Sequence, residues 1–385
     1  MSSPPTIFMA GGGTGGHVFP LLAVARAMQV LLPELQLVFI GTDRGIEGGL
    51  VPAAGFPLEL MSTLPFRGGG FSGASKGMLS VASSLPRARA LLQKYSPRAV
   101  FSVGGYAAVP ISVGARLSGA PLALMEPNAT PGLANRLVGP VAKRVYTAFE
   151  ETQRYFSAGV VVRSGLALRP GFLPSPYTWT GRGQALRVLV LGGSQGARSL
   201  NLAVAPALSQ VKFPLNIVHQ VGKGNLSAMR QRYAELKRPG ASVIEFIQDM
   251  PSALAAADLV ISRAGAGAIA EVCAVGRPSI LVPLPRSGDH QLHNAKAMEL
   301  VGAASCIPAG LASADGLCLR VNELAKDPER LARMAEAARA WGRPHATERV
   351  ARDLLVLAGL LSEPAAPEQP PPAPTGAIPA PGKDA

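Results

Sequence analysis

The sequence predicts an α/β protein of two doubly wound, Rossmann-like domains, each with a parallel sheet between layers of helices. Three observations support this. Short apolar runs alternate with segments of helical period along most of the 385 residues. The strand-like runs are continuously apolar, as is typical of parallel strands covered on both faces. They form two series of similar length, and a chain this long can build two cores.

The first series of strands occupies the N-terminal part of the chain. Its runs are TIFMA, LQLVFIG, RAVFSVG, PLALME and RVYTAF, at residues 6–10, 35–41, 98–104, 121–126 and 144–149. Segments of helical period lie between them, for example over 19–32 and 107–118. This alternation predicts a first Rossmann-like domain over residues 1–168.

A break in composition follows this domain. Residues 169–185, RPGFLPSPYTWTGRGQA, have little periodicity and predict a linker. A second series then predicts another Rossmann-like domain over 186–345, with the runs RVLVLGG, LNIVHQVG, SVIEFI, DLVISRAG and PSILVPL and helical periods over 197–209 and 267–275. Residues 362–385 are rich in proline and predict a disordered tail.

The charge distribution predicts an acidic partner. The net charge is +13, and no acidic residue lies between Glu59 and Glu126. Sparse aromatic residues and the lack of a nucleic-acid motif argue against nucleic acid, and an anionic membrane surface is the other candidate partner. The alternative is a basic face that is only solvated. The predicted docking face is residues 66–98, where apolar side chains alternate with basic ones: Phe66, Phe71, Met78, Leu79, Val81 and Leu85 beside Arg67, Lys76, Arg87 and Arg89.

Two further points concern this face and the compartment. Pro86 predicts a loop and a short helix over 66–98, and the alternative interpretation of this segment is a core helix with a solvated basic side.

The three scattered cysteines, at 273, 306 and 318, form no CxxC pair and fit a reducing compartment. With neither a signal peptide nor an apolar stretch of about 20 residues in the sequence, we expect a cytoplasmic protein.

Three loops of small residues follow predicted strands and open predicted helices. They are AGGGTGGHVFP, GGSQGARSLN and SRAGAGAIAE, at residues 10–20, 192–201 and 262–271. Helix N-termini bind anions, and small residues let a phosphate approach the backbone. Three such loops, divided between two domains, predict a cleft for a diphosphate compound. An alternative is a dinucleotide-dependent oxidoreductase, using the first loop and Asp43.

Polar residues near these loops are candidate ligand contacts. Glu271 interrupts an apolar helix and could accept hydrogen bonds from ribose hydroxyls. Gln291 and Asn294, in DHQLHNA, could also touch the ligand. The sequence contains no D-x-D pair, so we expect no metal ion and no cofactor. Helix N-termini and a basic side chain must then stabilise the negative charge of a leaving group.

Seven motifs occur in the order found in one known family. They are GGGTGGHVFP, GGYAAVP (104–110), EPN (126–128), GGSQGAR (192–198), EFIQDM (245–250), RAGAGAIAE (263–271) and DHQLHNA (289–295). From about residue 6 to 358 the chain resembles the MurG family of N-acetylglucosaminyltransferases, which convert lipid I to lipid II in peptidoglycan synthesis. The resemblance implies a GT-B fold with the domains facing across a cleft, and a last helix, 346–361, that crosses back to the first domain.

The resemblance also implies substrates and a location. The donor would be UDP-N-acetylglucosamine (UDP-GlcNAc), held mainly by the C-terminal domain. The acceptor would be a muramoyl-pentapeptide on undecaprenyl diphosphate, reached peripherally at the cytoplasmic face of the inner membrane. The implied donor contacts are Thr14, Gly15, Gly16, Asn128, Arg169, Ser194, Ile247 (against the uracil), Ala266, Gly267, Ala268, Ile269, Ala270, Glu271 (on the ribose) and Gln291.

Two motifs depart from the family pattern. The chain reads MEPN, ending at Asn128, where the family has HEQN, and GLALR, ending at Arg169, where it has GNPVR.

The implied reaction is an inverting, metal-independent transfer that needs a base for the acceptor hydroxyl. His17 is the candidate base, because its ordinary pKa near 6.5 suits that task. Glu126 is the alternative base, or an orienting residue. Still open are a His17 that only orders its loop and a GT-B glycolipid transferase with another acceptor.

Overall fold

The computed structural model describes residues 4–42, 45–61, 70–105, 108–193, 197–237, 240–284 and 289–363, with only the backbone for 70–79. Several predicted features lie outside the described residues: Asp43, Ser194, Phe66, Arg67 and the tail beyond Glu363. The side chains of Phe71, Lys76, Met78 and Leu79 are likewise not described.

The N-terminal domain is built on a seven-stranded parallel sheet of order β3-β2-β1-β4-β5-β6-β7. Every residue of its central strand β1 is buried, which explains its continuously apolar sequence. The strands are β1 (Thr6–Gly11), β2 (Gln36–Gly41), β3 (Leu58–Leu60), β4 (Ala99–Gly104), β5 (Leu122–Glu126), β6 (Arg144–Thr147) and β7 (Val161–Val162). The α-helices are α1 (Gly15–Leu31), α2 (Glu47–Ala53), α3 (Gly70–Tyr95), α4 (Ala108–Ser118) and α5 (Leu133–Val138), with short 3₁₀ turns at Gly139–Val141, Glu151–Tyr155 and Ala158–Val160.

The C-terminal domain is built on a six-stranded parallel sheet of order β10-β9-β8-β11-β12-β13. Its strands are β8 (Leu186–Leu191), β9 (Leu215–Gln220), β10 (Ser242–Ile244), β11 (Leu259–Ser262), β12 (Ser279–Leu281) and β13 (Ala304–Cys306). Its helices are α6 (Arg198–Gln210), α7 (Leu226–Glu235), α8 (Met250–Ala256), α9 (Ala266–Val275), α10 (His290–Leu300), α11 (Ala314–Ala325) and α12 (Pro328–Trp341), with a 3₁₀ turn at Ala309–Leu311. The predicted pair of doubly wound α/β domains is confirmed.

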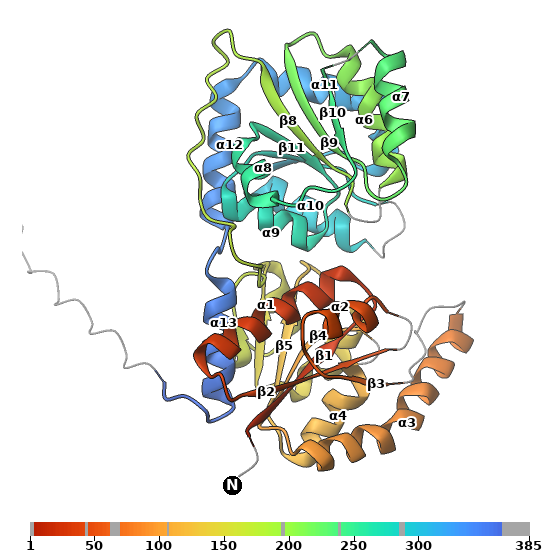
Figure 1. Cartoon of the computed structure of the whole chain (residues 1–385), viewed down its shortest axis with the longest axis vertical. Coiled ribbons are helices and arrows are strands. Elements are labelled where there is room, and N and C mark those ends of the chain that lie inside the picture. The colour runs from red at the N-terminus through yellow and green to blue at the C-terminus, as the bar shows by residue number, and fades with distance from the viewer. Residues whose placement is uncertain are drawn as a thin grey trace, which may run out of the picture.

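Both sheets have a switch point where the chain reverses its direction of strand addition. In the first sheet β1 lies between β2 and β4, and in the second β8 lies between β9 and β11. Connections from neighbouring strands diverge there and leave a crevice at the carboxyl ends, which is where open α/β sheets bind ligands. In Figure 1, α1 and α2 of one domain face α9 and α10 of the other, so the two crevices open toward each other.

A last helix, α13 (Ala346–Leu357), returns to the N-terminal domain and packs against α1 (Figure 1). The Thr347 hydroxyl donates to the Leu168 carbonyl at 2.6 Å and accepts from the Leu168 amide at 2.8 Å. The Tyr146 hydroxyl donates to Asp353 at 2.6 Å. The two segments that pass between the domains are therefore bonded to each other. The domain boundaries at residues 168, 185, 345 and 361 stay predictions.

The predicted break at Pro86 is wrong, because α3 runs as one helix from Gly70 to Tyr95. Proline removes one helical hydrogen bond and crowds the preceding turn, at a cost of about 3 kcal/mol. Tertiary packing offsets this cost: Ala88, Leu91 and Leu92 are almost fully buried, and the helix packs against α4. Among the described residues, no helix has the length and apolar character needed to cross a bilayer.

Candidate active site

The first glycine loop presents His17 at the carboxyl end of β1. Gly13 has φ +88°, a left-handed conformation that favours glycine, and α1 begins two residues later. In the first turn of α1, the His17 Nδ1 lies 3.1 Å from the Gly12 carbonyl and 3.3 Å from the Thr14 hydroxyl. An Nδ1–H donated to Gly12 leaves Nε2 as the unprotonated nitrogen.

The environment of His17 keeps the ring neutral. Burial lowers the pKa of His17, while the Gly12 carbonyl and the charge of Glu47 oppose that shift. The imidazole is therefore unprotonated at neutral pH and can accept a proton at Nε2. Of the neighbouring residues with predicted donor contacts, Thr14 and Gly16 are exposed and Gly15 is half-buried.

Glu126 is buried at the end of β5, and its carboxylate is fully engaged. Oε1 accepts from the backbone and side-chain nitrogens of Asn128 at 3.0 and 3.1 Å. Oε2 accepts from the Gly132 amide at 3.0 Å and Asn135 Nδ2 at 2.9 Å. Burial raises the pKa of Glu126, and these donors oppose the rise. Four donors fill the lone pairs of the carboxylate, so this geometry favours the orienting role over that of a base.

A polar junction joins the two domains beside Glu126. Asn294 on α10 is fully buried; its Oδ1 accepts from the Ala129 amide at 2.9 Å, and its Nδ2 donates to Asn128 Oδ1 at 3.1 Å and to the Ala264 carbonyl at 3.1 Å. His290 Nδ1 lies 3.0 Å from the Thr130 carbonyl. The amide of Asn128, a predicted donor contact, is thus bonded to the opposite domain rather than directed freely into the cleft.

The third loop opens α9 in the C-terminal domain. Ala266, Ile269 and Ala270 are buried, while Gly267 and Ala268 are half-exposed at the start of the helix. Small side chains there leave the first-turn amides open to an anion. Gln291 is the second residue of α10, and its Oε1 accepts at 3.0 Å from the amide of Leu284, which follows β12.

Glu271 lies in the second turn of α9 and is only half-exposed. Burial raises the pKa of Glu271 to about 7, and the positive charge of Arg169 opposes the rise. Within the described ranges its carboxylate accepts no hydrogen bond, so it is available to a ligand hydroxyl. Arg169 itself is exposed and lies 5.6 Å from the ring centroid of Phe172. Ile247 is buried, and its amide donates to Gln220 Oε1 at 3.2 Å.

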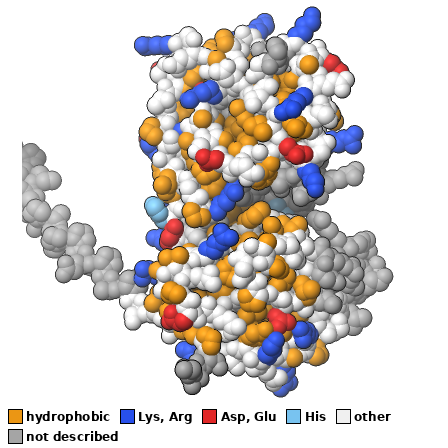
Figure 2. Space-filling view, viewed as in Figure 1, with side chains coloured by type: hydrophobic (Ala, Val, Ile, Leu, Met, Phe, Trp, Pro, Cys, Tyr) orange, Lys and Arg blue, Asp and Glu red, His pale blue; other side chains and the backbone are white. Residues whose placement is uncertain are grey.

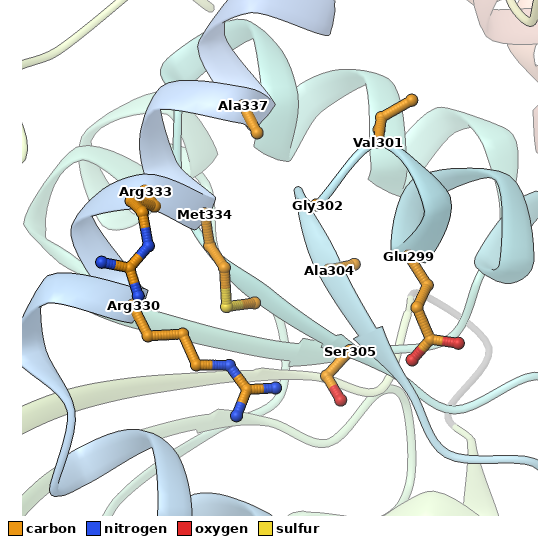
Figure 3. A pocket seen from close by; sticks show the side chains of 9 residues that line it. All are labelled: Glu299, Val301, Gly302, Ala304, Ser305, Arg330, Arg333, Met334 and Ala337. Atoms are coloured by element: carbon orange, nitrogen blue, oxygen red, sulfur yellow. The ribbon is translucent and has the colours of Figure 1, made fainter.

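The described residues bring no three His, Cys, Asp or Glu side chains close enough to hold a metal ion. A cavity of about 510 Å³ lies between α10, β13 and α12, lined by Ser305, Arg330, Arg333 and Met334 among others (Figure 3). None of the predicted site residues lines it. Figure 2 shows that the surface narrows between the two domains.

Comparison with known proteins identifies the family. Residues 7–147 match the model of the glycosyltransferase family 28 N-terminal domain, and residues 187–350 match that of the C-terminal domain. A UDP-N-acetylglucosamine–N-acetylmuramyl-(pentapeptide) pyrophosphoryl-undecaprenol N-acetylglucosamine transferase from Sorangium cellulosum is 47% identical over 92% of this chain and 88% of its own length. The chain belongs to this family, the MurG glycosyltransferases. A relative of the same name from Stutzerimonas stutzeri is 42% identical, with 89% of this chain and 96% of the relative covered.

A solved MurG structure shows the same fold. The Acinetobacter baumannii MurG superimposes with a TM-score of 0.75 and 32% identity, over 91% of this chain and 98% of the other. The predicted GT-B fold and MurG resemblance are therefore confirmed. Family membership also removes the oxidoreductase alternative, since this MurG chain is a glycosyltransferase.

Two residues of this MurG chain were missed by sequence reasoning. Arg263, directly after β11, donates to the carbonyls of Val282 and Pro283 at 3.1 and 3.3 Å and to the Ser199 hydroxyl, and so links the loops after β11 and β12 to the first turn of α6. A basic residue within the third glycine loop was the available signal. The other residue is Glu47, the first residue of α2, which is buried beneath the first loop.

Proposed function

We propose that this chain transfers N-acetylglucosamine from UDP-GlcNAc to undecaprenyl-diphospho-N-acetylmuramoyl-pentapeptide (lipid I), giving lipid II for peptidoglycan synthesis. The observation that carries the proposal is the 47% identity, over 92% of the chain, to a relative named for this reaction. The glycine loops at facing carboxyl ends of two parallel sheets support it, because such loops bind a diphosphate donor.

The proposed chemistry is an inverting displacement. His17 Nε2 accepts the proton of the muramoyl C4 hydroxyl, and that oxygen bonds to the anomeric carbon of the donor sugar. The bond from this carbon to the diphosphate breaks, and its electron pair leaves with UDP. The N-terminus of α9 and the guanidinium of Arg263 stabilise the negative charge that develops on the diphosphate.

Donor recognition is assigned to the loops of both domains. The diphosphate binds at Ala266–Ala270, Glu271 accepts from the ribose hydroxyls, and the uracil packs against Ile247. Gln291 contacts the sugar, Thr14–Gly16 approach from the N-terminal domain, and Asn128, Ser194 and Arg169 are the remaining donor contacts. The unpaired carboxylate of Glu271 and the open amides of α9 support this assignment.

Turnover of UDP-GlcNAc with a soluble lipid I analogue tests the function directly. The expected product is a disaccharide with inverted anomeric configuration, identified by mass spectrometry and NMR. A lipid-linked monosaccharide without the muramoyl group serves as the competing acceptor. Turnover of that lipid but not of the muramoyl acceptor would favour a different glycolipid transferase and contradict the proposal.

Glu271→Ala is expected to raise the donor KM by about tenfold or more, because a hydrogen bond to a charged group contributes about 1.5–3 kcal/mol. Steady-state kinetics at saturating acceptor measure the change. The matched control is Glu245→Ala, which removes an exposed carboxylate bonded to the Gly224 amide outside α9. An unchanged donor KM in the Glu271 variant would remove the ribose assignment.

Activity is expected to persist in EDTA. The sequence has no D-x-D pair, and the proposed charge stabilisation uses α9 and Arg263 instead of a metal. The initial rate is measured after dialysis against chelator, with and without added Mg²⁺ or Mn²⁺. Complete loss of activity on chelation, restored by metal, would contradict the metal-independent mechanism.

We also propose peripheral binding at the cytoplasmic face of the inner membrane through residues 66–98. In the part of this face whose side chains are described, Arg87 and Arg89 are exposed, and Val81 and Leu85 are half-buried beside them. Arg87 and Lys94 also pair with Glu59, at 3.0 and 2.9 Å. The exposed guanidiniums support electrostatic attraction to anionic lipid.

Co-sedimentation with phosphatidylglycerol vesicles is expected to rise with the anionic fraction and fall with salt. Changing Arg87 and Arg89 together to glutamate should weaken binding at least tenfold, since each basic residue near an anionic surface contributes about 1 kcal/mol. Turnover of a soluble acceptor should stay normal in this variant. Binding that is independent of the salt concentration and of the anionic lipid fraction would show that the docking face lies elsewhere.

A further inference from the structure

A buried carboxylate lies beneath the glycine loop that carries His17. Glu47 is 1% exposed. Its Oε2 accepts from the Gly13 amide at 2.8 Å, and its Oε1 accepts from the amide and the hydroxyl of Thr42, each at 2.9 Å. Although burial opposes it, these donors hold the pKa of Glu47 below its usual value, so the group is ionised. One side chain thus joins the loops that follow β1 and β2.

Local sequence makes room for this carboxylate. A Cβ atom on Gly41 would lie 2.6 Å from Glu47 Cγ, and one on Gly12 or Gly45 would overlap the carboxyl group. Three glycines from two loops therefore surround one acid. The first glycine-rich loop is shaped by Glu47 as well as by any phosphate it binds.

We propose that Glu47 is the positioning residue of the His17 base: its carboxylate fixes the Gly12–Gly13 backbone, whose carbonyl in turn holds the imidazole Nδ1. This inference rests on the proposed function for its consequence in catalysis. The connection is short, because the amide of Gly13 bonds to Glu47 and the carbonyl of Gly12, one residue earlier, lies 3.1 Å from His17 Nδ1. With the ring orientation set, Nε2 faces the acceptor hydroxyl.

Charge adds a second effect that a purely structural residue would not have. Burial lowers the pKa of His17, and the negative charge of Glu47 on α2 acts in the opposite direction. Removing the charge while keeping the shape should therefore shift the His17 titration to lower pH. If the loop merely loosened and admitted water, the titration would move the other way, toward about 6.5.

The test uses Glu47→Gln and Glu47→Ala in the full chain. Glu47→Ala is expected to lower kcat at saturating donor by on the order of 10²-fold, the effect of displacing a catalytic group by about 1 Å. Glu47→Gln is expected to lower kcat less and to move both the acidic limb of kcat and the NMR titration of His17 to lower pH. The signal of His17 is assigned with His17→Gln among the five histidines.

Asp258→Asn is the matched control, because Asp258 is another fully buried carboxylate, paired with Arg187 in the C-terminal domain. It should lower the melting temperature without changing kcat or the His17 titration. If the Glu47 variants fail to fold, Thr42→Val removes one donor to the carboxylate and should still lower kcat by on the order of tenfold.

Three outcomes overturn the inference: a Glu47→Gln protein with the kcat and His17 titration of the wild type, a Glu47→Gln protein whose His17 titration moves up toward about 6.5, or an unchanged kcat in Thr42→Val. The proposed function fails separately, if the wild type does not turn over a lipid I analogue. In that case the His17 titration of Glu47→Gln still decides whether Glu47 controls the ring.

Discussion

Replacing His17 with alanine is expected to lower kcat by roughly 10²–10⁴-fold, the usual range for loss of a general base. The affinity for UDP should change little, because the imidazole reaches the acceptor hydroxyl and makes no proposed contact with the nucleotide. Steady-state kinetics with a lipid I analogue measure kcat, and calorimetric titration with UDP measures affinity.

A matched variant separates chemistry from folding. His345→Ala removes an exposed histidine before α13, outside the site, and should leave kcat unchanged. If His17→Ala keeps its kcat and loses instead UDP binding or thermal stability, then His17 orders the glycine loop and another group takes the proton.

Arg277→Leu is expected to lower the free energy of unfolding by at least about 3 kcal/mol, since each buried acceptor left without a donor costs about 1–3 kcal/mol. Arg277 is only 2% exposed and fastens the linker to the C-terminal domain. Its guanidinium donates to the Ser175 hydroxyl and to the carbonyls of Ser175, Pro176, Leu254, Ala255 and Gly276. Urea unfolding followed by circular dichroism measures the loss.

Arg232→Ala is the control for this experiment. Arg232 is an exposed arginine on α7 whose guanidinium lies 3.9 Å from Glu235, and its loss should cost less than about 1 kcal/mol. An Arg277→Leu midpoint within error of the wild type would mean that water replaces the guanidinium at all of these carbonyls.

The central strands were predictable because burial on both faces imposes a continuous apolar run. Of the four edge strands, β10 was predicted as part of the run SVIEFI, but the other three were not. β3, β7 and β13 contain three, two and three residues, too few to show a pattern, and pairing with a neighbour stabilises them. The uninterrupted course of α3 through Pro86 was missed for a related reason, because packing against α4 outweighed the local preference of proline.

The glycine loops of the site were predictable because each is a local motif, with its strand, loop and helix consecutive in sequence. The residues that connect these loops were harder to find. Glu47 bonds to Gly13 across 34 positions and Asn294 to Ala129 across 165, and no spacing rule indicates such pairs. For the same reason, the four hydrogen bonds that the Glu126 carboxylate accepts could be found only in the folded structure.

The paired crossings between the domains have a consequence for motion. The chain passes from one domain to the other near Leu168 and returns just before Thr347, and these two residues hydrogen-bond to each other. Two chain crossings that hydrogen-bond to each other oppose sliding and twisting of one domain against the other. Hinge rotation about an axis through the two crossings is then the movement that costs least. Under the proposed function, a domain that opens to release UDP would close again about the same line, which would return the His17 loop to the same position relative to the N-terminus of α9.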